Sequence, residues 1–457
     1  MSEKRSGLDL TQGRINIVLL KFALPFVASG FVMALHGVIS MLVIGKFAGP
    51  ETISGVATGT QMMFPPFAFI MGLGTSGTVL IGKCIGKKDD AAGTKALGSF
   101  VIVSIALVIF LTLAMLFGRE PLLAALKTPP EAYASARKYV MLCTIGVPFN
   151  AAYSMICAVA RGMGNSKAPS IAAAVSCIVN IALSLILVGV FHLAEAGVAI
   201  ATSAAQFVSF VHMGIWICKN KPPFKFMRSD IRADRESVKF LIVVGIPLIL
   251  QELLISISFM INTNRVNILG VEASASVGVV SRVFNVAGVI PQSIGSAIAA
   301  MTAQNLGAGK PDRAVSSLRW GIAYSAIINA IVLFFCQFRP EAITAVFARD
   351  RTIIVAAAFY LRSFSLEALL IAFTFCMNAY LSGCGKSHVS MWSALASSFL
   401  IRVPLSIWVT GLDSLALNDK LYYLGLASPV ATLVTLIVCL AFIITYNRKR
   451  LKEPVEL

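Results

Sequence analysis

Twelve mainly apolar stretches run through this chain of 457 residues, and each is long enough to cross a lipid bilayer. A membrane-spanning helix needs about 20 such residues. Because 57% of the residues are hydrophobic and only 13% are charged, the chain has more apolar surface than a soluble core of this length can bury. The predicted fold is an all-α integral membrane protein. The predicted spans are residues 18–45, 53–81, 96–118, 138–160, 169–190, 197–218, 240–264, 275–303, 320–336, 357–380, 389–411 and 423–446.

The second half of the chain repeats the first at an offset of 221 residues. Most matched positions are loop glycines, where backbone geometry restricts the choice of residue, so the pattern indicates an internal duplication. We predict an N-terminal six-helix lobe (1–218), a basic linker (219–239), a C-terminal six-helix lobe (240–446) and a tail (447–457). Six spans is an even number, so the lobes are parallel repeats. The matched pairs are Gly49 and Gly270, Glu51 and Glu272, Gly86 and Gly307, Tyr139 and Tyr360, Gly162 and Gly383, Gly164 and Gly385, and Ser166 and Ser387.

The distribution of basic residues predicts the orientation. With both termini inside, about 25 of the 38 Lys and Arg residues fall on cytoplasmic segments, as membrane proteins require. This placement explains the formal charge of +17 without a nucleic-acid partner. We therefore expect a multi-pass plasma-membrane protein with two cytoplasmic termini, in contact with the lipid bilayer and monomeric.

Several classes of chemistry lack their sequence signatures. The nine cysteines form no CxxC motif and lie near no histidine cluster, so we expect neither disulfides nor a metal site beyond a transient sodium ion. No phosphate-binding loop of the type Gly-x-x-x-x-Gly-Lys-[Ser/Thr] occurs. No catalytic triad or carboxylate pair is visible in the short loops. We expect no enzyme activity and no cofactor, with any energy coming from an ion gradient.

Four runs of residues carry a family resemblance. The first run extends from Leu24-Pro25 through Ile44-Gly45 to Gly49-Pro-Glu51, and the second is Gly72-Leu-Gly-Thr. The third is Arg161-Gly-Met-Gly-Asn-Ser-Lys167, together with Asn180. The fourth is Ser281-Arg282, together with Gln304-Asn-Leu-Gly307. Over nearly the whole chain, the sequence resembles the multidrug and toxic compound extrusion transporters. The resemblance implies twelve helices in two lobes. It also implies export of small organic compounds, driven by inward flow of protons or sodium.

Two positions depart from that family pattern. Bacterial members commonly carry an Asp at each of the places where this chain has Ser40 and Ser184. A serine hydroxyl does not titrate in the physiological range. If those acids carry ion coupling elsewhere in the family, the N-terminal lobe of this chain does not couple in that way.

Two glutamates are predicted to lie near the bilayer midplane. Glu252 falls about 18 Å into the seventh span and Glu367 about 15 Å into the tenth, at 1.5 Å per residue. An acid in hydrocarbon costs several kcal/mol, so it is a functional candidate. The resemblance places acids in these two helices, though about one turn away. Arg282 and Arg402 are the expected charge partners, and an inert buried ion pair is the competing interpretation.

Polar residues in the spans supply further candidates. His36 lies one helical turn before Ser40, and its imidazole is a second candidate proton carrier. Uncharged side chains suit a sodium ion or a polar substrate cavity, although hydrogen bonding between helices explains each singly. These cavity candidates are Ser40, Asn180, Ser184, Gln251, Asn262 and Asn378.

Three functions remain open on the sequence. The first is an ion-coupled exporter of amphipathic organic compounds, mainly cations. The second is a flippase for a lipid-linked or other anionic precursor. Arginine in the membrane suits a pyrophosphate, whereas a cationic drug prefers a negatively charged cavity. The third is a channel or membrane enzyme, which the lack of catalytic motifs disfavours.

Overall fold

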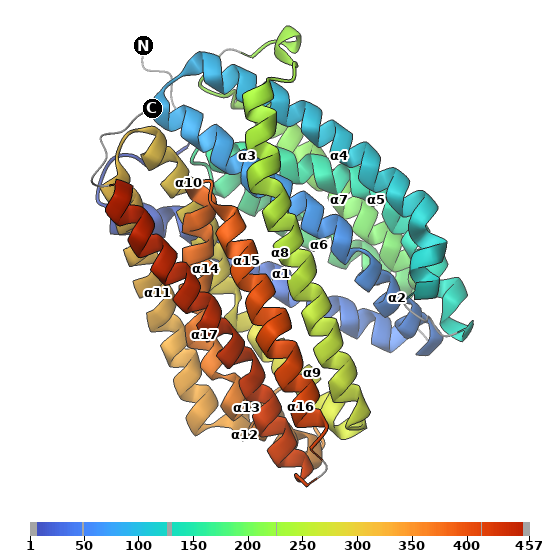
Figure 1. Ribbon diagram of the computed structural model, residues 1–457. Coiled ribbons are helices and arrows are strands. Elements are labelled where there is room, and N and C mark those ends of the chain that lie inside the picture. The colour runs from blue at the N-terminus through green and yellow to red at the C-terminus, as the bar shows by residue number, and fades with distance from the viewer. Residues whose placement is uncertain (1–6, 48–49, 126–129, 225, 413, 451–457) are drawn as a thin grey trace. The chain divides into compact units, whose positions relative to one another are not determined.

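The chain is described by a computed structural model that covers residues 7–47, 50–125, 130–224, 226–412 and 414–450. Within these ranges the regular structure is helical, no strand occurs, and twelve helical segments are long and apolar enough to cross a membrane. The predicted all-α membrane fold with twelve spans is therefore confirmed (Figure 1). The helices are α1 (Ile15–Phe47), α2 (Pro50–Met62), α3 (Phe64–Lys87), α4 (Asp90–Ala125), α5 (Pro130–Gly162), α6 (Lys167–Ser184), α7 (Ala194–Lys219), α8 (Arg235–Ile268), α9 (Val271–Ala287), α10 (Val289–Gly307), α11 (Pro311–Phe338), α12 (Pro340–Ala345), α13 (Arg351–Phe364), α14 (Leu366–Gly383), α15 (Ser387–Ser397), α16 (Val403–Thr410) and α17 (Leu417–Arg450), with π-helical turns η1 (Leu185–Val190) and η3 (Ser398–Arg402) and a short 3₁₀ turn η2 (Arg228–Asp230).

Three predicted spans are each built from two consecutive helices. The second span breaks at Met63, between α2 and α3, next to the Pro65-Pro66 pair that removes helix hydrogen bonds. The eighth breaks at Gly288, between α9 and α10. The tenth breaks at Ser365, whose hydroxyl bonds to the Arg362 oxygen at 2.9 Å and accepts from the Gln337 side chain at 2.8 Å. These breaks place irregular backbone within the spans, and at Ser365 the Gln337 side chain donates to the Arg362 oxygen at 2.7 Å.

The residues group into two compact units by their contacts. The first contains residues 1–12, 20–246 and 303–308, and the second contains residues 13–19, 247–302 and 309–457. In the first unit α5 lies at the centre, against α2, α3, α4 and α7 (Figure 1). Phe100 is buried there and packs against Gly77, whose missing side chain makes room for the ring.

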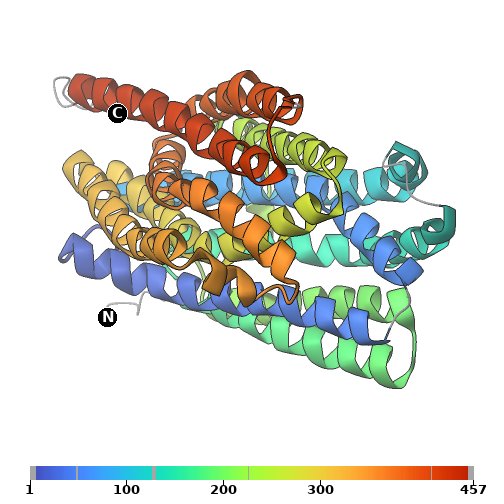
Figure 2. The same ribbon diagram turned by 90° about the horizontal axis from the view of Figure 1, so that it is seen from below.

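In the second unit α17 is the central element. It runs alongside α13 and α14 in both ribbon views (Figures 1 and 2). Phe364 of α13 packs edge-on against Phe284 of α9, with ring centroids 4.5 Å apart, and stacks on Tyr360 at 5.3 Å. This aromatic group forms part of an apolar core next to the polar residues described below.

Three regions distant in sequence meet at one end of the first unit. The Leu8 amide donates to the Gly164 oxygen at 3.0 Å, and the side chain of Gln304 donates to the Gly162 oxygen at 2.7 Å. Asn305 donates to the Leu10 oxygen at 3.1 Å. The segment before α1, the loop after α5 and the end of α10 are thus joined by hydrogen bonds.

Candidate functional site

Glu367 is a buried carboxylate with one bonded and one unbonded oxygen. It lies in the first turn of α14, and 6% of the residue is exposed. Thr432 of α17 donates its hydroxyl to Oε1 at 2.7 Å, while Oε2 has no hydrogen-bond partner among the described residues. A buried ionised group usually has all of its oxygens paired, so this half-paired arrangement is a candidate for reversible ion binding.

Arg402 lies close to Glu367 but forms no ion pair with it in the described part of the chain. The charges of the two side chains interact with each other and with the hydroxyl of Tyr360. Arg402 ends the π-helical turn η3, and Pro404 follows it without an amide to continue the helix ladder. Such π-helical turns occur frequently at functional sites.

The guanidinium of Arg402 is stacked rather than hydrogen-bonded. Its centre lies 4.7 Å from the ring centroid of Phe259 on α8. Only 6% of Arg402 is exposed. Its Nε and Nη1 atoms nevertheless have no hydrogen-bond partner within the described ranges. Cation–π contact offsets part of the burial cost, about 2 kcal/mol when the pair is desolvated. The two free nitrogens keep Arg402 available to Glu367 or to an anion.

A row of buried polar side chains follows one face of α8. Gln251, Ser258 and Asn262 are spaced by seven and four residues, which puts them on the same face. One side-chain oxygen of each residue has no hydrogen-bond partner among the described residues: Gln251 Oε1, Ser258 Oγ and Asn262 Oδ1. The Ser428 Oγ atom on α17 also has no such partner. Each unpaired buried atom costs about 1 to 3 kcal/mol unless water or an ion satisfies it. The row therefore suits a hydrated or ion-binding environment.

The two glutamates occupy different environments. Glu252 on α8 is exposed, in contrast to Glu367, and forms no ion pair with any residue that the structure describes. Arg282 on α9 is also exposed and takes no part in an ion pair in the same ranges. The structure thus brings Arg402 to Glu367 and leaves Arg282 away from such a pairing. Glu252 is an accessible titratable group on α8.

The first unit holds a small uncharged network. Asn180 Nδ2 donates to Thr202 Oγ1 at 3.2 Å, and Ser184 Oγ donates to Asn180 Oδ1 at 3.3 Å. All of these groups are neutral, so the network offers polar contacts without a proton carrier. His36 and Ser40 belong to α1, but their side chains lie outside the described residues.

Asn378 is another polar side chain of the second unit. It is half-buried, and its Oδ1 accepts from Cys439 Sγ at 3.6 Å, which in turn is 3.5 Å from Ser393 Oγ. One oxygen lone pair of Asn378 is thereby used by a weak donor. Asn378 therefore has less capacity to bind an ion than Gln251 or Asn262.

Sequence reasoning missed the uncharged residues that contact Glu367 or Arg402 and two of the residues with unpaired buried hydroxyls. Thr432, Ser428, Ser258 and Phe259 carry no charge and resemble the many other Ser, Thr and Phe residues in the spans. The seven-residue spacing of Gln251 and Ser258 was the one available signal. No group of three or more His, Cys, Asp or Glu side chains is placed to hold a metal ion in the described ranges.

Comparison with known proteins gives consistent matches. The MatE family model matches residues 25–186 and again residues 247–408. The chain is 25% identical to the probable multidrug resistance protein YoeA of Bacillus subtilis over 337 residues, covering 72% of this chain and 73% of that protein. It is 22% identical to the multidrug export protein MepA of Staphylococcus saprophyticus over 425 residues, covering 92% of each.

A solved structure supports the fold. A MOP superfamily transporter from Pyrococcus furiosus Vc1 superposes with a TM-score of 0.91 at 19% identity, covering 99% of this chain and 100% of that chain. The match of one family model to both halves agrees with the duplication and with the motif resemblance. The chain therefore belongs to the MatE family of multidrug efflux transporters.

Proposed function

We propose that the protein exports amphipathic organic compounds, mainly cations, in exchange for inward-moving protons or sodium ions. Membership of the MatE family and the names of its relatives YoeA and MepA support the transport class. In this proposal the protein is a monomer in the plasma membrane with both termini in the cytoplasm. Transport alternates access to the two sides of the membrane through rearrangement of the duplicated halves.

The half-paired carboxylate of Glu367 is the observation that carries this proposal. A proton or a cation bound at Oε2 removes the negative charge that attracts Arg402. When the ion leaves, the carboxylate regains its attraction for the guanidinium, whose Nε and Nη1 are available. The site thus has two electrostatic states that differ by one ion. A conformational equilibrium responds to an ion that binds its states with different affinity.

Other unpaired oxygens of the second unit bear on which ion is used. Gln251, Asn262 and Glu367 each hold an unpaired buried oxygen in the described chain. Sodium coordination needs several such oxygens converging on one point, whereas a proton needs Glu367 alone. The positive charge of Arg402 disfavours a sodium ion close to it. We therefore propose the proton as the coupling ion and sodium as the alternative.

The free nitrogens of Arg402 favour a second candidate function, transport of an anionic or lipid-linked substrate. Two unbonded N–H groups on a buried guanidinium are donors for a phosphate or carboxylate. The related Pyrococcus furiosus transporter is described as having a binding pocket of reverse polarity that suggests a different function. In this alternative Arg402 holds the substrate and Glu367 positions Arg402.

Competition transport separates these functions. Proteoliposomes that accumulate a fluorescent organic cation are assayed with excess tetraphenylphosphonium, and separately with excess pyrophosphate or anionic lipid headgroup analogue. We expect inhibition by tetraphenylphosphonium alone. Inhibition by the anions alone, with translocation of a labelled lipid, would instead establish the flippase. An Arg402→Gln variant sharpens the comparison. In the exporter it should still bind the organic cation but lose coupling, whereas in the flippase it should lose binding of the anionic substrate.

A further inference from the structure

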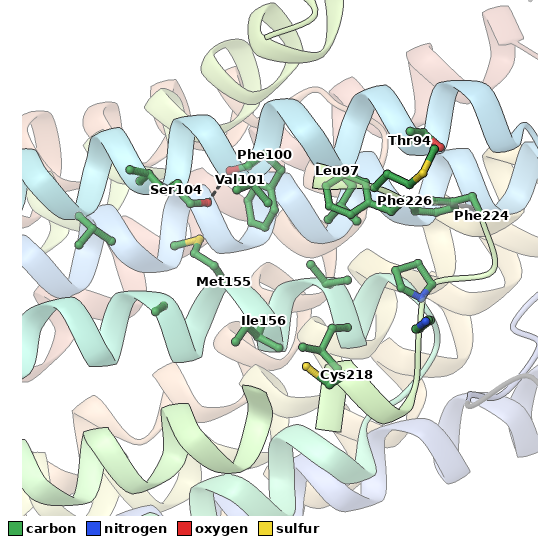
Figure 3. A pocket seen from close by; sticks show the side chains of 18 of the residues that line it. Thr94, Leu97, Phe100, Val101, Ser104, Met155, Ile156, Cys218, Phe224 and Phe226 are labelled. Carbon is green, nitrogen blue, oxygen red and sulfur yellow. Dashed lines mark hydrogen bonds between the residues drawn. The ribbon is translucent and has the colours of Figure 1, made fainter. Parts of the chain in front are cut away.

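An apolar groove lies in the first unit. It has a volume of about 1420 Å³ and follows α5 between α4 and α7 (Figure 3). Leu97, Phe100 and Val101 come from α4, and Met155 and Ile156 come from α5. All of the residues that line the groove belong to the first unit. The groove thus needs its own explanation.

The apolar part of the groove has the length of one bilayer leaflet. Its lining on α4 runs from Leu97 to Ile109, which is about 18 Å at 1.5 Å per residue. Half of a hydrocarbon core is about 15 Å. Ile105 and Ile109 on this wall are 53% and 54% exposed, so the wall is open along its outer half. In a chain that spans the membrane, such a wall contacts lipid rather than water.

The linker closes one end of the groove. Phe224 is buried and packs against Gly93 of α4, where a side chain would clash with its ring. Further along, the Asp234 amide donates to Ser99 Oγ at 2.9 Å, and that hydroxyl donates to the Arg232 oxygen at 3.4 Å. The linker is therefore fastened to α4 on both sides of η2. This attachment gives the groove a fixed end.

The closed end carries charge. Lys221 is exposed and lines the groove beside Pro222 and Pro223, which restrict the backbone that presents it. Asp90 of α4 also lines this end, but it lies in the first turn of its helix, whose partial positive charge offsets the acid. Residues 219–239 contain seven basic and three acidic side chains, a net charge of +4. The end of the groove is therefore favourable for an anion.

We propose that this groove binds one anionic phospholipid, with its phosphate at Lys221 and an acyl chain along α4 and α5. Basic pockets between membrane helices recognise anionic headgroups, at about 1 kcal/mol for each Lys or Arg near the surface. The apolar length matches one chain in one leaflet, and the linker is held where the headgroup lies. The lipid occupies a site that is lined by residues of the first unit alone.

Cys218 provides a native reporter for this site. It lines the groove, and among the nine cysteines, all of which lie in the described ranges, it alone is exposed. The purified full-length protein in detergent is treated with a maleimide after addition of phosphatidylglycerol, phosphatidylcholine or inorganic phosphate. We expect phosphatidylglycerol to protect Cys218 at a concentration about fivefold lower than phosphatidylcholine requires, and phosphate to give no protection.

Two charge reversals make the test specific. Lys221→Glu should weaken protection by phosphatidylglycerol about 5- to 30-fold, because it removes one attraction and adds one repulsion. Lys239→Glu makes the same charge change in the same basic segment, but Lys239 is exposed on α8 and does not line the groove. This control should leave protection within twofold. Ala152→Phe, which fills the groove from α5, should abolish protection by both lipids.

Three outcomes would overturn the proposal. Equal protection by both lipids would remove the anionic preference. Equal effects of Lys221→Glu and Lys239→Glu would reduce it to general attraction by the basic linker. Protection by tetraphenylphosphonium without protection by either lipid would assign the groove to an organic cation.

Discussion

Gly86 and Gly307 each pack against the backbone of the other's helix. A side chain on Gly86 would meet the Gln304 oxygen, and one on Gly307 would meet the Lys83 oxygen. Gly86 and Gly307 are equivalent positions of the duplication, and so are Lys83 and Gln304, because each pair is 221 residues apart. The contact is therefore reciprocal. Both glycines are needed because the partner at each is backbone, which has little freedom to move.

Alanine at either glycine should separate the ends of α3 and α10. For Gly307→Ala we expect the contact between the ends of α3 and α10 to be destabilised by about 1 to 3 kcal/mol. Cysteines placed at Lys88 and Ala308 in a Cys218→Ser background should then cross-link less efficiently than without Gly307→Ala. Gly278→Ala is the control, because nothing lies within 4 Å of the added carbon and alanine suits a helix. Unchanged cross-linking in Gly307→Ala would show that the contact does not hold the two ends together.

Removing the hydroxyl of Thr432 should slow ion-coupled transport without preventing substrate binding. Thr432→Val keeps the side-chain shape but leaves Oε1 of Glu367 without its 2.7 Å hydrogen bond, at a cost of about 1 to 3 kcal/mol. Thr432→Ser retains a donor and should transport nearly as wild type does. Thermal unfolding and gradient-driven efflux are measured on the same preparations. Indistinguishable Val and Ser variants would exclude a role for this hydrogen bond.

The stacking of Arg402 on Phe259 should depend on the aromatic ring. Phe259→Leu keeps an apolar side chain but removes the cation–π contact at 4.7 Å, so we expect a loss of about 1 to 2 kcal/mol in unfolding free energy. In an Arg402→Leu background the same change should cost less than about 0.5 kcal/mol, because the cation is gone. A double-mutant cycle by thermal unfolding measures this coupling. Additive effects would show that the ring is simply part of the apolar packing.

The start of α13 should contribute a stability that disappears in acid. Asp350 is exposed and accepts from the Thr352 amide at 2.9 Å and hydroxyl at 2.6 Å, and these hydrogen bonds hold its pKa below the usual range. A lowered pKa stabilises the fold above the ordinary value and loses that effect as pH falls through the folded value. Asp350→Ala should therefore unfold at a lower temperature than wild type at pH 7, and the difference should shrink as the pH falls below 3.8, the ordinary aspartate value.

Asp350→Asn serves as the control for that measurement. It retains a capping oxygen without a titrating group, so its unfolding temperature should follow the pH less steeply than wild type. A constant gap between wild type and Asp350→Ala from pH 7 to pH 3 would contradict the assignment.

The sequence predicted the helices well because a bilayer imposes strict length and polarity requirements. Twelve apolar stretches sufficed to predict the spans, and the matching glycines indicated the duplication before any contact was known. The breaks at Gly288 and Ser365 were missed. Hydropathy measures polarity along the chain, whereas the break at Ser365 is held by the side chain of Gln337, which lies 28 residues away in the sequence.

The buried cluster was only partly predictable. Glu367 and Arg402 stand out in an apolar sequence because charge is costly there, but Thr432 does not. Glu252 and Glu367 have similar depth in their spans and were equivalent candidates, while the structure leaves one exposed and buries the other. Which way a side chain faces depends on packing between helices, and twelve spans with similar apolar faces leave that undetermined.

Gradient-driven efflux from proteoliposomes tests the central claim most directly. Wild type, Glu367→Gln and Glu252→Gln are compared for efflux of an organic cation under an imposed proton or sodium gradient, with substrate binding measured in detergent. The account predicts that Glu367→Gln binds substrate but loses gradient-driven efflux at least tenfold, whereas Glu252→Gln retains most of it. Wild-type efflux by Glu367→Gln under both gradients would contradict the account, because the buried carboxylate would then be structural.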